Sequence, residues 1–178
     1  MAGPAAPEQA ETALATLLMA GLAERLGGLS EVDVLVDCGR LRPSSPVAAL
    51  LAAATATVLV ARPTLAEVAH LRPRVAALRS RRPALLLVGD RPYAAEEVAA
   101  AVDVPVLGVL AQDHRGAQTV AGERDGVGRG LVRSKLVRSA VPVAQRLVQD
   151  HVMSGRDADD HAAAAAGLAS NGQIGGRR

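Results

Sequence analysis

The sequence predicts an α/β fold: a mostly parallel sheet with helices on both faces. Four short runs are apolar throughout instead of alternating with polar residues, which is typical of strands covered on both faces of a parallel sheet. The segments between these runs carry helical periodicity or helix caps, so strands and helices alternate along the chain. The chain has 178 residues, of which 49% are hydrophobic and 21% charged, enough to bury one core.

Residues 1–30 are expected to form a leader and one helix. Apolar residues recur at helical spacing between Glu8 and Leu26, and two glycines end the pattern. The run Val32–Val36 then predicts the first strand, which leads directly into Asp37 and Gly39. An acid and a glycine at the carboxyl end of a buried strand are typical of a metal or phosphate site.

The middle of the chain predicts two more strand–helix pairs. Val47–Ala54 reads as a short buried helix, and Thr57–Ala61 as the second strand. A helix follows from Thr64 to about Arg79, because Thr64 and Glu67 have the spacing of a capping box. Pro73 is expected to kink this helix or to begin a second segment.

The remaining strands lie at Ala84–Val88 and Val104–Leu110, with a short helix at Ala94–Ala101 between them. Asp113 is expected to cap the next helix, and Gly122 to end it. Residues 122–130 read as a flexible linker, and a last helix runs from Ser134 to about Val152. We therefore predict an α/β domain over residues 31–152 and a disordered tail over 153–178.

Composition restricts the class of protein. The net charge is +2, but the arginines are scattered and aromatic residues for base stacking are nearly missing, so there is no strong nucleic-acid signal. The single cysteine, Cys38, fits a reducing compartment and reads as a small buried filler. No secretion signal and no apolar run of membrane-spanning length is found, which predicts a soluble cytoplasmic protein without a membrane span.

A search for catalytic motifs finds no phosphate loop. The string G-x-x-x-x-G-K-[ST] does not occur, and Lys135, the only lysine, lies in "VRSKLV", far from any strand–glycine–helix context. The nucleophile motif G-x-S-x-G does not occur, and the four histidines lack the spacing of metal ligands. Two interpretations of Asp37 remain open. Its carboxylate either caps the following turn or lies beside a bound metal ion, as the Walker B aspartate does.

Three stretches together resemble the second half of MinD/ParA-type P-loop ATPases, in the divergent form of chromosome-partitioning proteins from high-GC bacteria. They are "DVLVDCGRL", "ATATVLVARPTLAEVAHLRPRVAALR" and "PALLLVGDRPYAAEEVAAAVDVPVLGVLAQDHRGAQTVAG". The resemblance implies that Asp37 helps to hold Mg²⁺ through water, that Gly39 meets the γ-phosphate of ATP, and that Asp113 lies on the base side. The family's phosphate loop, K-G-G-x-G-K-T/S, has no counterpart here.

Three functions remain open at this point. The first is a MinD/ParA-like domain without its own phosphate loop, a pseudo-ATPase that acts as a binding or regulatory module or is a remnant of an ATPase. The second is an ATPase of the same family whose phosphate loop lies upstream or comes from a partner chain, the case in which ATP and Mg²⁺ would bind. The third is an unrelated α/β domain of flavodoxin or receiver type. A protein partner or self-association is expected.

The resemblance also raises a question about the sheet. In the family, the phosphate-loop strand lies beside the Walker B strand, so its loss would leave Val32–Val36 without a neighbour on one side. We expect Val32–Val36 to pair directly with Thr57–Ala61. The alternative is a strand supplied by another chain, since unpaired buried backbone groups are costly.

Overall fold

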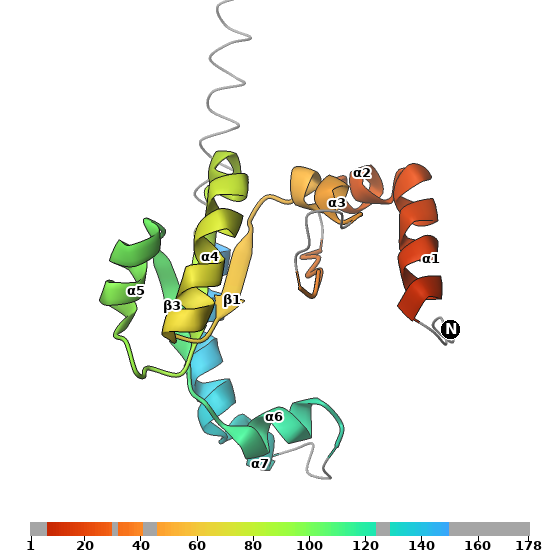
Figure 1. Ribbon diagram of the computed structural model, residues 1–178. Helices are drawn as coiled ribbons and strands as arrows, with labels where there is room; N and C mark the ends of the chain where they lie inside the picture. Colours follow the sequence, from red (N-terminus) through yellow and green to blue (C-terminus); the bar gives the residue numbers. More distant parts are fainter. Residues whose placement is uncertain (1–6, 30–31, 41–45, 124–128, 150–178) are drawn as a thin grey trace, which may run out of the picture. The chain divides into compact units, whose positions relative to one another are not determined.

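The computed structural model describes residues 7–29, 32–40, 46–123 and 129–149 (Figure 1). The chain divides into two compact units. One contains Met1–Thr57 and Arg72–Pro83, and the other contains Val58–Leu71 and Ala84–Arg178. The predicted boundary at residues 30 and 31 and the predicted tail at 153–178 lie outside the described residues.

The second unit holds a three-stranded, all-parallel sheet. Its strands are β1 (Val58–Ala61), β2 (Ala84–Val88) and β3 (Val106–Leu110), in the order β1-β2-β3. Leu85 and Leu87 of the central strand lie on one face of the sheet and are almost completely buried, and the alternate residues on the other face are half-buried. The predicted α/β fold with a parallel sheet is therefore confirmed.

Helices connect the strands and cover the sheet. The connections are α4 (Leu65–Leu78) and α5 (Ala95–Val102). Because crossovers between parallel strands are almost always right-handed, a 1-2-3 strand order is expected to place both helices on the same face. Val98 and Val102 of α5 are buried. Helix α4 continues through Pro73 as one helix, so the predicted second segment does not form; the 3₁₀ turn η1 (Arg79–Arg81) follows it.

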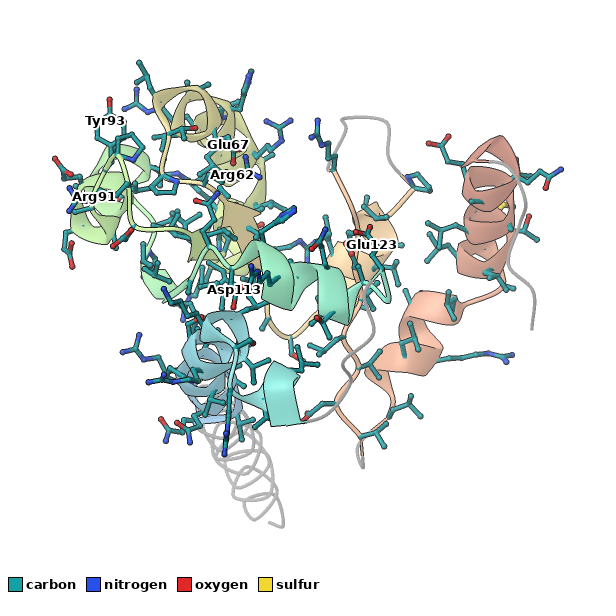
Figure 2. The ribbon with its side chains drawn as sticks, turned by 90° about the horizontal axis from the view of Figure 1, so that it is seen from below. Arg62, Glu67, Arg91, Tyr93, Asp113 and Glu123 are labelled. Atoms are coloured by element: carbon teal, nitrogen blue, oxygen red, sulfur yellow. The ribbon has the colours of Figure 1, made fainter. Side chains whose placement is uncertain are left out.

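A helix over residues 135–149 covers the opposite face of the sheet (Figures 1 and 2). Its buried Val143 lies directly over Gly108 of β3, where an added Cβ would be only 2.5 Å from Val143 Cγ2. Two short helices, α6 (His114–Val120) and α7 (Arg129–Val132), precede it. The predicted linker at 122–130 is therefore partly wrong, because α7 begins within it.

Besides the end of α4 and the turn η1, the first unit contains three helices: α1 (Pro7–Met19), α2 (Leu22–Gly27) and α3 (Ala48–Ala53). The single helix predicted up to Leu26 is interrupted at Gly21, whose φ of 82° is left-handed and ends the α-helical path. A small apolar cluster holds the described part of this unit together. It consists of Ala23, Val47 and Leu50, with Leu14, Leu18, Leu26, Cys38 and Leu51 packed against them.

The predicted strand Val32–Val36 is wrong. Residues 32–40 have no strand or helix, and the apolar side chains of the run are exposed, Leu35 by 91%. The expected pairing with Thr57–Ala61 is therefore not formed in the structure. β-Branched residues favour an extended backbone, but a strand forms only where a neighbouring strand supplies hydrogen-bond partners.

Candidate functional site

The candidate site is the edge of the sheet where the three parallel strands end, which is where ligands bind in open α/β sheets. Three turns leave this edge: Arg62–Thr64 after β1, Gly89–Ala94 after β2 and Ala111–Asp113 after β3. Figure 2 is seen from this side. It shows Arg62 beside Glu67, Arg91 and Tyr93 on the turn after β2, and Asp113 beside α6 and the helix over residues 135–149.

The turn after β1 is closed by Glu67. Its Oε2 accepts a hydrogen bond of 2.6 Å from the backbone nitrogen of Arg62, and Thr64 Oγ1 accepts one of 3.4 Å from the nitrogen of Glu67. The predicted cap by Thr64 is confirmed. The carboxylate reaches back to Arg62 because the nitrogen of Thr64 already donates to the Arg62 carbonyl oxygen, 2.8 Å away.

The turn after β2 is closed in the same way. Glu97 Oε2 accepts a hydrogen bond of 2.7 Å from the backbone nitrogen of Ala94. The nitrogen of Tyr93 donates to the carbonyl oxygen of Pro63, 3.3 Å away, and so ties this turn to the one after β1. The side chains of Asp90, Arg91 and Tyr93 remain exposed at the edge.

The turn after β3 is organised by Asp113, which caps two helices. Its Oδ1 accepts from the nitrogen of Gly116 at 3.0 Å, which caps α6 as predicted. Its Oδ2 accepts from the nitrogens of Lys135 at 2.9 Å and Leu136 at 3.3 Å, the first amides of the helix over residues 135–149. Ser134 Oγ accepts from the nitrogen of Val137 in the same turn.

These hydrogen bonds lower the pKa of the Asp113 carboxyl group. The bond from the Gly116 amide is the largest cause, burial opposes it, and the amides of Leu136 and Lys135 and the Lys135 charge add to the lowering. Gly116 is buried, and a Cβ at this position would lie 2.9 Å from Asp113 Oδ2 and 3.2 Å from Leu136 Cβ. A glycine at position 116 therefore lets the carboxylate reach both helices.

The outer edge of β3 is covered by side chains of the helix over residues 135–149. Ser139 Oγ accepts from the nitrogen of Ala111 at 2.8 Å, and Arg146 Nη1 donates to the carbonyl oxygen of Leu107 at 2.7 Å. Leu107 lies at a register shift, where β3 has one residue more than β2 between paired positions. Arg146 therefore satisfies a carbonyl group at the irregular part of the strand.

Asp37 and Gly39 lie together in one turn of the first unit, whereas Asp113 belongs to the second unit. Asp37 Oδ1 accepts a hydrogen bond of 2.8 Å from the nitrogen of Gly39, whose φ is 58°. This is the arrangement expected of the turn-capping interpretation. Cys38, half-buried against the apolar cluster, has its thiol pKa raised by burial and then by the Asp37 charge.

The described residues contain no group of three His, Cys, Asp or Glu side chains placed to hold a metal. Within the same residues, no helix has the length and apolar character needed to cross a bilayer.

Sequence reasoning missed the residues that come from the helix over residues 135–149. Lys135, expected to lie far from any strand–glycine–helix context, has its backbone nitrogen bonded to Asp113, just beyond β3. Ser139 and Arg146 were not singled out either. Ser134 at a helix start is a local signal for a cap, but no local pattern reveals that Asp113 is the second capping group.

Comparisons with known proteins add no assignment to this α/β fold. No family model matches the chain, and no match was found among the curated proteins or the solved structures compared with it.

Proposed function

We propose that this chain is a MinD/ParA-like binding or regulatory module that acts without a phosphate loop of its own. The resemblance in sequence suggests a role in chromosome partitioning or in positioning a cargo. The α/β architecture with consecutive parallel strands is compatible with such a domain.

One observation carries the proposal: at all three turns of the ligand edge, carboxylates of the chain itself accept hydrogen bonds from backbone amides. Glu67, Glu97 and Asp113 accept hydrogen bonds from five amides in total: those of Arg62, Ala94, Gly116, Lys135 and Leu136. Backbone amides at helix starts are the groups that bind phosphate oxygens in nucleotide sites. A nucleotide at these amides would have to displace a carboxylate that repels it.

The test is a phosphate-release assay on the full chain with Mg-ATP. We expect no turnover above the protein-free rate, since positioning and charge neutralisation by a phosphate cradle supply most of the catalysis in this class. The matched variants are Asp37→Ala, at the position that the resemblance assigns to Mg²⁺, and Asp33→Ala, an exposed acid of the same segment.

Turnover that disappears in Asp37→Ala but persists in Asp33→Ala would contradict the proposal. It would favour the competing function, an ATPase whose phosphate loop is supplied from elsewhere. Equal turnover in both variants would point to a contaminating ATPase. The phosphate-release assay would then be repeated on protein from which that activity has been removed, and this result would decide the proposal.

A further inference from the structure

We draw no further inference here: the strongest candidate, the exposed apolar stripe of Val141, Ala144 and Val148 on the helix over residues 135–149, carries none, because nothing in the structure shows what covers it.

Discussion

Asp113 Oδ2 lies 2.9 Å from the backbone nitrogen of Lys135, which follows it by 22 positions in the chain. This hydrogen bond joins the turn after β3 to the start of the helix that covers the other face of the sheet. A negative charge at a helix N-terminus is stabilising, because it meets unpaired amides and the positive end of the helix dipole. The chain thus supplies its own anion at a place where an α/β protein can bind one.

We expect Asp113→Ala to lower the melting temperature by roughly 5–10 °C, because the change removes the cap of α6 and a cap of the helix over residues 135–149 together. Thermal unfolding followed by circular dichroism measures the shift. The control is Asp90→Ala, an exposed aspartate on the neighbouring turn, which should shift the midpoint by no more than roughly 2 °C. Equal shifts in the two variants would show that the double cap is unimportant.

The stabilisation by Asp113 should depend on pH in the acid range. Its pKa in the folded protein is lowered chiefly by the Gly116 amide, below the value of about 3.9 for an unfolded chain. The contribution is therefore complete above about pH 4 and is lost as the pH falls through the lower pKa of the folded state. Melting curves of the unaltered chain and Asp113→Asn should converge below about pH 4; a difference that stays constant into strong acid would contradict this origin.

Gly108→Ala should destabilise the sheet by about 1–3 kcal/mol, because the new methyl group would overlap Val143 and valine has little rotamer freedom in a helix. Urea unfolding measures this loss. In a Val143→Ala background the cost of Gly108→Ala should be smaller, which shows that the two positions are coupled. The control is Gly130→Ala, where an added Cβ meets nothing within 4 Å. Equal costs in the two backgrounds would mean that Val143 is not the obstacle.

Cys38 should react slowly with iodoacetamide near neutral pH. Burial, and then the negative charge of Asp37, raise its pKa and so reduce the thiolate fraction. Asp37→Asn should speed the reaction by roughly threefold, the scale of one unit charge acting across a wet protein surface. Asp33→Asn is the control. Mass spectrometry of the alkylated chain gives the rate, and equal rates for both variants would exclude a role of the Asp37 charge.

Local patterns in the sequence predicted the elements whose signals are complete within a few residues. Ala84–Val88 is found as β2 with the predicted bounds, because a short apolar run lies between turn residues on both sides. Asp113 and Thr64 cap their helices as expected. In each case the residues that determine the structure are neighbours in the chain.

The features that depend on distant contacts were not predictable. Leu65 and Val75 are both apolar residues of α4, but Leu65 is 70% exposed whereas Val75 is buried. The run Val32–Val36 has the composition of a strand but no neighbour in the structure. The second role of Asp113 depends on Gly116 and on a helix more than twenty residues away, and no spacing rule encodes it.

The central claim is that the chain's own carboxylates accept hydrogen bonds from five backbone amides at the ligand edge of the sheet, so that these amides are not available to a nucleotide. The most direct measurement is a titration of the isotope-labelled full chain with Mg-ATP, followed by the amide NMR signals of Arg62, Ala94, Gly116, Lys135 and Leu136. These five amides bond to Glu67, Glu97 and Asp113. The account predicts that their signals do not move. The contradicting result is a set of chemical-shift changes at these amides that saturate with increasing Mg-ATP, together with amide exchange that changes on binding. This result would show that nucleotide displaces the carboxylates.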